Sequence, residues 1–411
     1  MEYRPIPDDH RDAFGRLLRY AFRPQAGPPD EEDEEDRPEH PDIYHPRALY
    51  DVDSGAPDDD LDADDMVVVC AYYDFSLRVR GEFHRVGGVS AVASPPEIRR
   101  QGHVGRLLRE LHEELREEGV ALAALWPFKY SFYRRYGYAT ATEYAHAEIA
   151  PDELSAVVAD PAGRFRRVDP DDWADLAAVY EAWGPDSLAM DRTEGYWRHR
   201  VLTGWQEDPY VYLWEDDDGE PRAYAVYRVQ DGDDDGRTLQ VWEFAHADDE
   251  GRRQLYRFLR DHDSQVETVT FAGPTETYLL ETLEDPRAAE LEFRPGPMVR
   301  VVDLEAAVAD LSFPADAEGS VVLAVDDDHL PWNDGRFELS VAGGGGTCEP
   351  TDAEADVELD VGALSQLVAG FLSVDRLETY GDLTVVSETG AETLAAMFPP
   401  EEPAPFLREG F

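Results

Sequence analysis

One stretch of the sequence, Gly87–Gly137, constrains the fold of this chain more than any other. It has the pattern of a buried strand, a turn rich in arginine and glycine, an amphipathic helix, a second buried strand and an aromatic, basic turn. The first strand contains a run of small residues, Ser90–Ser94, which lets other groups approach its backbone closely. At the turn, Gly102 has no Cβ, so the main chain can lie against a ligand there. This order predicts a strand–helix–strand unit with a ligand-binding turn.

The helix predicted after this turn begins near His103 and has one apolar face. That face is formed, at 3.6-residue spacing, by Val104, Leu107, Leu108, Leu111 and Leu115. The free backbone N–H groups at the start of the helix, with Arg99 and Arg100 beside them, are suited to hold a phosphate group. A strand that ends in such a cradle fits a long ligand with a pyrophosphate at one end, such as coenzyme A.

These residues resemble the acetyl-CoA-binding core of the GNAT acetyltransferases. The signature of that family is Arg or Gln, two residues, Gly, one residue, and then Gly or Ala. Here Arg99 and Gly102 match, Val104 stands in the last position, and Gly105 follows it. In this position Val104 resembles the aliphatic residue that commonly follows the turn in a narrower group, the enhanced-intracellular-survival (Eis) family. The segment Ser131–Tyr138, SFYRRYGY, resembles the aromatic turn of the same family. The two blocks together resemble an Eis-like GNAT N-acetyltransferase.

The resemblance implies which residues lie along coenzyme A. The implied contacts are Val92, Ala93 and Ser94 with the pantetheine, Arg100, Gln101, Gly102, His103, Val104 and Gly105 with the pyrophosphate, and Phe128 and Lys129 at the end of the second strand. A histidine in a phosphate cradle more often donates or faces solvent than acts as a base, so His103 is given no catalytic role. Lys129 is the only lysine of the chain, which suggests that it was kept for a function. That it remained by chance where other lysines were replaced explains it equally well.

The resemblance also implies two catalytic groups. Tyr133 is the counterpart of the general acid of Eis enzymes, and a phenol with a pKa of ~10 matches a thiol leaving group. From position alone, Tyr133 is more simply one aromatic residue in a packed cluster. The second group is the C-terminal carboxylate of Phe411, which in Eis proteins folds back into the first domain and serves as the base. Because an α-carboxylate has a pKa of ~3.5, we expect it to orient the amine and to pass the proton through water. The alternative is a frayed tail.

The length of 411 residues predicts two or three domains. By resemblance we expect an α/β (α+β) protein with two tandem GNAT-like domains and a sterol-carrier-protein-like α/β domain. The expected ranges are 1–150 for the catalytic domain, 151–293 for a second, degenerate copy, and 294–411 for the last domain. The second copy has the sequence AHADDEGRRQL where the phosphates would sit, so it is not expected to bind coenzyme A. In the last domain two helices are expected, one over Leu364–Ser373, and an interior filled by its own side chains is favoured over a lipid pocket.

The charge of the chain is extreme. Its formal net charge is −53 and its isoelectric point is near 4.3, with arginine supplying all basic charge except that of Lys129. This composition is typical of proteins from extreme halophiles, where salt screens the repulsion between acidic side chains. An acidic surface is therefore no evidence for a cationic substrate. No basic face is visible, so nucleic acid is not an expected partner.

The two cysteines and the N-terminal sequence exclude several classes of protein. Cys70 and Cys348 lie far apart in sequence and give neither a metal-ligand spacing nor a disulfide framework, so no metal is expected. The N-terminus has no long apolar run, so neither a signal peptide nor a membrane span is expected. We therefore expect a soluble, cytoplasmic protein.

The leading hypothesis is an acetyl-CoA-dependent N-acetyltransferase that transfers acetyl directly to a primary amine in a ternary complex. The acceptor implied by the resemblance is an aminoglycoside-like molecule, a polyamine or a protein lysine. The rivals are a non-enzymatic lipid- or acyl-CoA-binding protein and a degenerate GNAT scaffold. A homo-oligomer, a hexamer by resemblance, is also implied.

Overall fold

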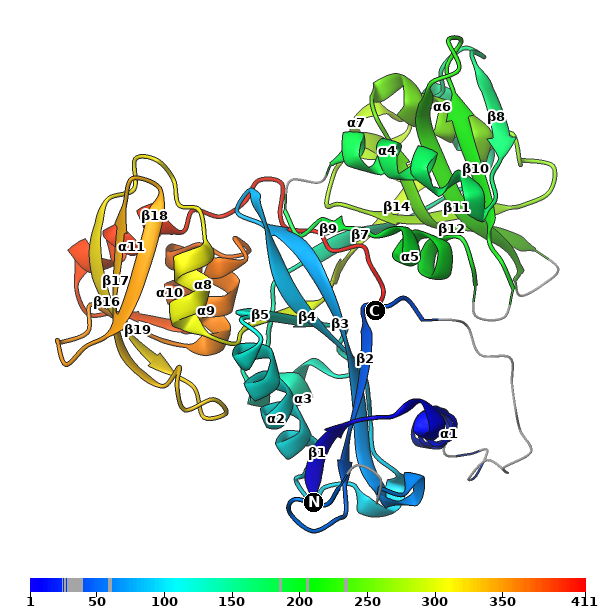
Figure 1. Ribbon diagram of the computed structural model, residues 1–411. Helices are drawn as coiled ribbons and strands as arrows, with labels where there is room; N and C mark the ends of the chain where they lie inside the picture. The colour runs from blue at the N-terminus through cyan, green and yellow to red at the C-terminus, as the bar shows by residue number, and fades with distance from the viewer. Residues whose placement is uncertain are drawn as a thin grey trace.

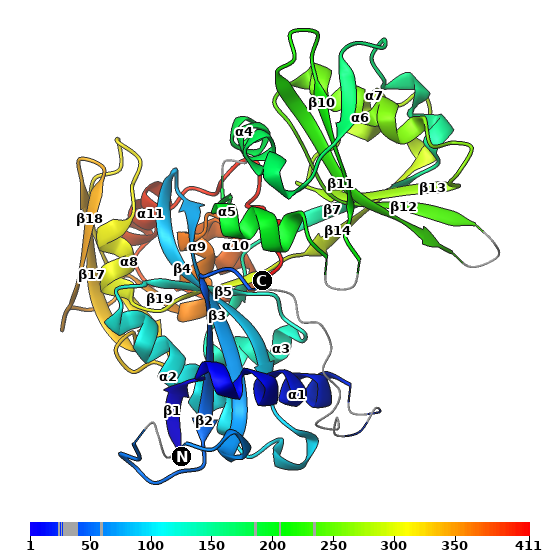
Figure 2. The same ribbon diagram turned by 45° about the vertical axis from the view of Figure 1, so that its right-hand side comes forward.

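The computed structural model describes the whole chain except residues 24, 26, 28–39, 58–60, 185–186, 205–206 and 233–235. Its strands form three sheets, and each sheet with its helices makes one lobe (Figure 1). The mixed α/β class expected from the sequence is confirmed. In both ribbon views the N-terminus lies at the far end of the first lobe, whereas the C-terminus lies between the first and the second lobe (Figures 1 and 2).

The first sheet has the strand order β1-β2-β3-β4-β5-β15-β6, and β9 also pairs with β3. Its strands are β1 (Glu2–Pro5), β2 (Tyr44–Tyr50), β3 (Met66–Val79), β4 (Glu82–Ala93), β5 (Leu122–Leu125), β6 (Ala139–Thr140), β9 (Met190–Asp191) and β15 (Met298–Val301). Only β4 and β5 pair in parallel among these described strands. Helix α2 (His103–Glu117) begins where the sequence predicted and buries four of its five predicted apolar residues, while α1 (Arg11–Phe22) packs into a different cluster. The short helix α3 (Tyr130–Tyr133) follows β5.

The second sheet has the order β14-β7-β13-β12-β11-β10-β8. Its strands are β7 (Glu143–Ile149), β8 (Arg164–Arg167), β10 (Tyr210–Glu215), β11 (Pro221–Asp231), β12 (Arg237–His246), β13 (Thr268–Gly273) and β14 (Ala289–Pro295). Its helices are α4 (Trp173–Trp183), α5 (Glu194–Tyr196), a π-helical turn over Trp197–Val201, α6 (Asp249–Arg260) and α7 (Tyr278–Thr282). As in the first sheet, one parallel pair, β12 with β13, lies beside an antiparallel set. This likeness supports the expected second copy of one fold.

The third sheet has the order β18-β17-β16-β19-β20. Its strands are β16 (Gly319–Asp326), β17 (Gly335–Ala342), β18 (Gly345–Pro350), β19 (Val357–Asp360) and β20 (Leu383–Val385). Its helices are α8 (Leu304–Asp310), α9 (Val361–Val368), α10 (Val374–Tyr380) and α11 (Glu388–Met397), so two expected helices were too few. The helix expected over Leu364–Ser373 is α9. It begins earlier because the Asp360 side chain accepts from the Ala363 N–H at 2.7 Å, and Gly370, with φ +73°, stands beyond its end.

Two strands near the expected domain limits at residues 150 and 293 pair in the sheet of another domain than the one expected. Strand β7, expected in the first unit, pairs with β13 and β14 in the second sheet. Strand β15, expected to open the third unit, is inserted between β5 and β6 of the first sheet. The physical reason is that parallel pairing with β4 leaves the other edge of β5 without a partner, and all four residues of β15 are buried there.

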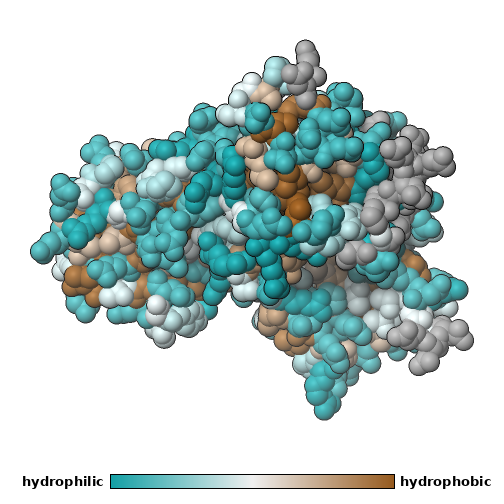
Figure 3. Space-filling model, turned by 90° about the horizontal axis from the view of Figure 1, so that it is seen from below, coloured by the Kyte–Doolittle hydropathy of each residue, from teal (hydrophilic) through white to brown (hydrophobic). Residues whose placement is uncertain are grey.

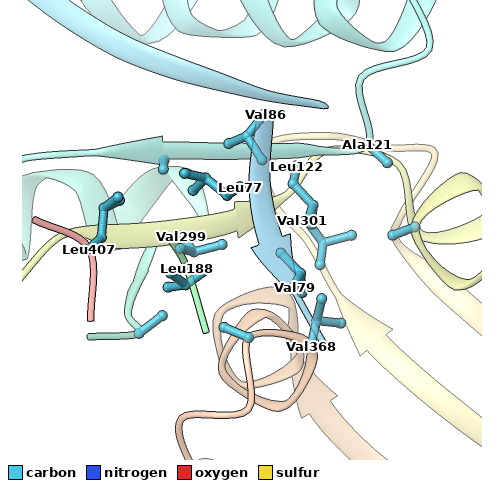
Figure 4. Packing of buried hydrophobic residues seen from close by; sticks show 14 of the residues in the cluster. Leu77, Val79, Val86, Ala121, Leu122, Leu188, Val299, Val301, Val368 and Leu407 are labelled. Atoms are coloured by element: carbon cyan, nitrogen blue, oxygen red, sulfur yellow. The ribbon is translucent and has the colours of Figure 1, made fainter. Parts of the chain in front are cut away.

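One hydrophobic core runs through the first and third lobes and extends into the second. Figure 4 shows side chains of β3, β4, β5, β15 and α9 in contact, among them Leu77, Val299 and Val368, together with Leu407 from the C-terminal tail. The helix α9 is buried along its whole length. The C-terminal tail is thus anchored in the core at Leu407, four residues before Phe411.

The outer surface reflects the acidic composition. On the face drawn in Figure 3, hydrophilic residues cover most of the molecule and hydrophobic ones gather in patches. Among the described helices, none combines the length and the apolar character that crossing a bilayer requires.

Candidate active site

Strands β4 and β5 diverge in the middle of the first sheet. They pair in parallel only from Val86 with Leu122 to Val89 with Leu125, and β4 then continues to Ala93 without β5 beside it. At this point β4 carries a bulge opposite Cys70, and Ala91 has a φ of +52°. A non-glycine residue in this conformation is uncommon and is typical of functional sites. Beyond Val89 the edge of β4 is therefore not covered by β5, which fits the close approach that the run of small residues predicted.

The turn before α2 has the geometry of a phosphate cradle. Arg100 and Gly102 both adopt left-handed conformations, with φ of +64° and +87°, and both are exposed, as is Gln101. No side chain caps the start of α2, and its first turn contains no acidic residue. Its N–H groups can therefore bind an anion.

The partners of Arg99 differ from the expectation. Its guanidinium donates to the carbonyl oxygens of Ser94 at 3.2 Å and of Ala21 at 2.8 Å. It therefore braces the turn against the end of α1. Arg100 remains as the arginine on the exposed side of the cradle.

The other implied cofactor contacts lie around the same gap. His103, Val104 and Gly105 form the half-buried first turn of α2, and a Cβ on Gly105 would come within 3.1 Å of the Tyr136 ring. Phe128 and Lys129 lie beyond β5, and both are exposed. The implied pantetheine and pyrophosphate contacts thus follow one another from the end of β4 to the first turn of α2. Val92 lies on the face that α2 covers, whereas Ala93 belongs to the cluster on the other face.

Tyr133 lies at the centre of the aromatic turn. It is 4% exposed, and its ring contacts those of Phe128, Phe132 and Tyr138, with centroid distances of 5.5, 5.1 and 6.0 Å. It belongs to the hydrophobic cluster beneath α2, together with Val89. Burial raises the pKa of Tyr133 above that of a free tyrosine, so the phenol stays protonated at neutral and moderately alkaline pH.

A buried arginine of the first sheet links the aromatic turn to the third lobe. Arg300 of β15 is fully buried and donates to the Tyr136 carbonyl oxygen and, at 2.5 Å, to the Asp327 carboxylate. An open cavity of about 210 Å³ adjoins this contact and is lined by Arg134, Arg135 and several aspartates. None of Val92, Tyr133 or Phe411 lines it, so this cavity is separate from the candidate active site.

The C-terminal tail ends beside the gap between β4 and β5. Trp126, the residue after β5, donates its indole N–H to the Glu409 carbonyl oxygen at 2.7 Å. From the second lobe, Tyr196 and Arg200 donate to the Gly410 carbonyl oxygen at 3.2 and 2.8 Å. The Phe411 ring packs against Phe75 and Tyr73 of β3, with centroid distances of 4.9 and 6.3 Å. The chain end is therefore docked.

Two adjacent glycines of β4 show that α2 and the tail lie on opposite faces of the sheet. A Cβ on Gly87 would meet Leu115 of α2, whereas a Cβ on Gly88 would meet Phe75 and come within 2.9 Å of the Phe411 ring. Tyr133 therefore lies on one face of the sheet and the Phe411 ring on the other. The Gly87–Gly88 pair in an apolar strand was a sequence signal for this close approach, although it did not identify Trp126, Tyr196 or Arg200 as partners of the tail.

Substituting Gly88 by alanine is expected to displace Phe411 and to lower kcat by about tenfold, because the added methyl group has no room on that face. Steady-state kinetics and calorimetric titration with acetyl-CoA measure the effect. Gly87→Ala is the matched control, since it overpacks the same strand against Leu115 instead. Equal kcat values for the two variants would contradict a role for the docked tail.

The corresponding turn in the second lobe is closed to phosphate. The Asp248 side chain caps α6 by accepting from the Gly251 N–H at 2.8 Å, and Arg222 forms an ion pair with the same carboxylate. A Cβ on Gly251 would lie 2.7 Å from the Arg222 carbonyl oxygen, so the strand and the helix are in tight contact. The acids that the sequence showed at this turn thus occupy the helix N-terminus themselves.

Among the described residues, no group of three or more histidine, cysteine or acidic side chains is arranged to hold a metal ion. Both cysteines are buried and unpaired. Burial raises the pKa of the Cys348 thiol to about 12 and raises that of Cys70 still further above its ordinary value.

Family models match most of the chain. Residues 2–141 and 188–301 each match an acetyltransferase (GNAT) domain, and residues 304–406 match a sterol carrier protein domain. An uncharacterized N-acetyltransferase of Streptomyces coelicolor is 29% identical over all of both chains. The N-acetyltransferase Eis of Mycobacterium tuberculosis is 28% identical over 74% of this chain and 76% of that protein.

Solved structures share the whole fold. A probable N-acyltransferase from Enterococcus faecalis has a TM-score of 0.83 at 21% identity, covering 100% of this chain and 99% of that one. Eis1 from Mycobacterium abscessus has a TM-score of 0.75 at 24% identity, covering all of both chains. The three family matches and the Eis relatives agree with the strand order and the cradle described above. The chain is thus an Eis-like N-acetyltransferase of the GNAT superfamily, with two GNAT domains followed by a sterol-carrier-protein-like domain.

Proposed function

We propose that this enzyme transfers acetyl from acetyl-CoA directly to a primary amine while both substrates are bound. The amine belongs to an aminoglycoside-like molecule, a polyamine or a protein lysine. The observation that supports the proposal is the docked chain end: Trp126 and Tyr196 bond the tail, and the Phe411 ring packs on the face of the sheet opposite α2 and Tyr133. We assign the gap between β4 and β5 as the place where the two substrates meet. The gap is then the passage through which the amine meets the thioester.

The proposed reaction needs three groups. Backbone N–H groups of β4 around Val92 polarise the thioester carbonyl. The amine nitrogen attacks that carbon, the carbon–sulfur bond breaks, and Tyr133 protonates the leaving thiolate. Before the attack, the carboxylate of Phe411 holds the incoming ammonium group and passes one of its protons to water. After the attack, the nitrogen loses a second proton, which restores the phenol of Tyr133. The products are an N-acetyl amide and free coenzyme A.

Direct transfer is supported by the state of the two thiols. A ping-pong mechanism through an acetyl-cysteine needs an accessible thiolate. Cys70 and Cys348 are buried, and burial raises the pKa of both. Initial-rate measurements that vary acetyl-CoA and amine together distinguish the mechanisms, because a ternary complex gives intersecting reciprocal plots and a ping-pong mechanism gives parallel ones.

The function is tested by measuring the release of free coenzyme A with a panel of amines in molar KCl. We expect turnover with at least one class among aminoglycosides, polyamines and lysine peptides. Coenzyme A binding without turnover on any amine would instead favour a degenerate scaffold, and lipid that copurifies with the protein would favour the binding-protein alternative.

We also propose a homo-oligomer, a hexamer by resemblance, which light scattering in the same buffer measures.

Replacing Gly102 by glutamate is expected to weaken acetyl-CoA binding by at least about 2 kcal/mol, close to 30-fold. The new carboxylate would stand where the pyrophosphate is proposed to lie, and the left-handed backbone disfavours any side chain there. Calorimetric titration gives the affinity. Gly119→Glu is a matched control, because Gly119 is also exposed and left-handed but lies beyond the other end of α2. Unchanged affinity in a folded Gly102→Glu protein would rule out this cradle.

A further inference from the structure

A cluster of buried charges lies around the third residue from the chain end. The Arg192 guanidinium contacts the Glu409 carboxylate at 2.6 Å and the Glu243 carboxylate at 2.7 and 3.1 Å. The hydroxyl of Tyr180 donates to Glu409 at 2.8 Å, and that of Tyr224 donates to Glu243. The side chains of Arg192 and Glu409 are 1% and 0% exposed.

The members of this cluster come from distant parts of the chain. Arg192 follows β9, which is paired with β3 of the first sheet, whereas Glu243 lies on β12 and Tyr180 on α4 of the second lobe. Glu409 is supplied by the tail. The cluster therefore joins the first lobe, the second lobe and the chain end at one point.

The cluster is balanced in charge. Arg408, next to Glu409, donates to the Phe244 carbonyl oxygen at 2.8 Å and stacks on Trp183 at 4.1 Å. Two arginines thus accompany two glutamates, and the arginines lower the pKa of Glu243 in spite of its burial. Burying a carboxylate without such partners is strongly unfavourable, so Glu409 is stable at this depth only when it meets Arg192.

We propose that Arg192 and Glu243 form a receptor for Glu409 that sets the register of the tail, and that Glu409 is a positioning residue for the Phe411 carboxylate. The degenerate second lobe would then have a defined task, which is to hold the chain end of the first lobe's active site. A shift by one residue moves a chain by ~3.5 Å, and a buried ion pair tolerates no such shift. The kinetic part of this inference rests on the proposed function of Phe411.

The first test measures docking without measuring activity. Glu409→Gln keeps the shape of the side chain and removes its charge. A carboxypeptidase that cleaves C-terminal aromatic residues reaches Phe411 only when the tail is undocked, and mass spectrometry of the intact protein follows the loss. We expect cleavage of Glu409→Gln to be about 10- to 100-fold faster than that of the wild type, as the loss of a charge-assisted hydrogen bond predicts.

Glu215→Gln is the matched control. Glu215 is also a buried carboxylate of the second lobe, 8% exposed, but its ion pairs at 2.6 Å are with Arg164 and Arg166 of β8 and not with the tail. This variant is expected to resist the carboxypeptidase like the wild type. Equal cleavage rates for Glu409→Gln and the wild type would overturn the receptor, as would equal acceleration in both variants.

Kinetic measurements then test the proposed role of Phe411 independently of the docking of the tail. We expect Glu409→Gln to lower kcat by about tenfold with an unchanged KM for acetyl-CoA, because the proposed coenzyme A contacts lie at the end of β4 and the start of α2 and Glu409 touches neither. Glu215→Gln should keep the wild-type kcat. If the tail of Glu409→Gln is released and kcat is unchanged, the positioning role and the function of Phe411 both fail while the receptor stands.

Discussion

Replacing Tyr133 by phenylalanine is expected to lower kcat by about 10²-fold or more while the affinity for acetyl-CoA is kept. The substitution removes the proton donor to the thiolate but keeps the ring in its contacts with Phe128, Phe132 and Tyr138. Single-turnover rates and calorimetric titration measure the two quantities separately. A packing residue would instead leave turnover near that of the wild type, because the ring is unchanged.

The neighbouring tyrosine provides the control. Tyr136→Phe also removes one hydroxyl from the aromatic turn, and Tyr136 packs on Gly105 at the start of α2 rather than beneath it. Its effect on kcat should be smaller. A larger loss in Tyr136→Phe than in Tyr133→Phe would mean that the wrong tyrosine has been assigned.

The pH profile follows from the environment of Tyr133. Burial raises its pKa, so the phenol stays protonated as pH rises through the range in which an amine of pKa ~10 becomes neutral. In wild type, kcat/KM should therefore rise with pH and should show no alkaline fall from Tyr133. A fall with an apparent pKa of about 9 that disappears in Tyr133→Phe would contradict the raised pKa.

Local features of the first domain were predictable because short-range patterns determine them. The apolar face of α2 repeats every three to four residues, and the turn before it needs the left-handed conformation that Gly102 adopts. The helix start at His103 and the strand of small residues before it followed from such patterns, whereas the bulge at Ala91 did not. The roles of Tyr133 and Phe411 came from a family resemblance and not from any periodicity.

Long-range pairing was not predictable in the same way. The apolar segment of β15, preceded by proline and glycine, has the pattern of a strand that opens a new domain, and only the free edge of β5 explains its place in the first sheet. Glu409 is one of 90 acidic residues, so no spacing distinguishes it from the solvated ones. Its significance arises from Arg192, which lies more than two hundred residues earlier in the chain and meets it only in the folded protein.

A few residues appended after Phe411 are expected to lower kcat by about 10²-fold, because the carboxylate moves away from the site and the added residues prevent docking. Deleting Phe411 should have a similar effect, since the new carboxylate lies ~3.5 Å away from the position in which we propose that it holds the ammonium group. Phe411→Leu separates the ring from the carboxylate: it keeps the chain length and an apolar side chain against Phe75, so most of the activity should remain.

The other end of the chain is the control for the tag itself. Met1 lies at the far end of the first lobe, where its amino group donates to the Val52 carbonyl oxygen at 2.9 Å (Figure 1). An N-terminal tag converts that amine to an amide, which still has an N–H to donate, and leaves the tail untouched. In steady-state assays the N-terminally tagged protein should therefore turn over ~10²-fold faster than the C-terminally extended and truncated proteins. Equal rates would mean that the docked carboxylate takes no part in the reaction, and the base would have to be sought among other groups at the gap.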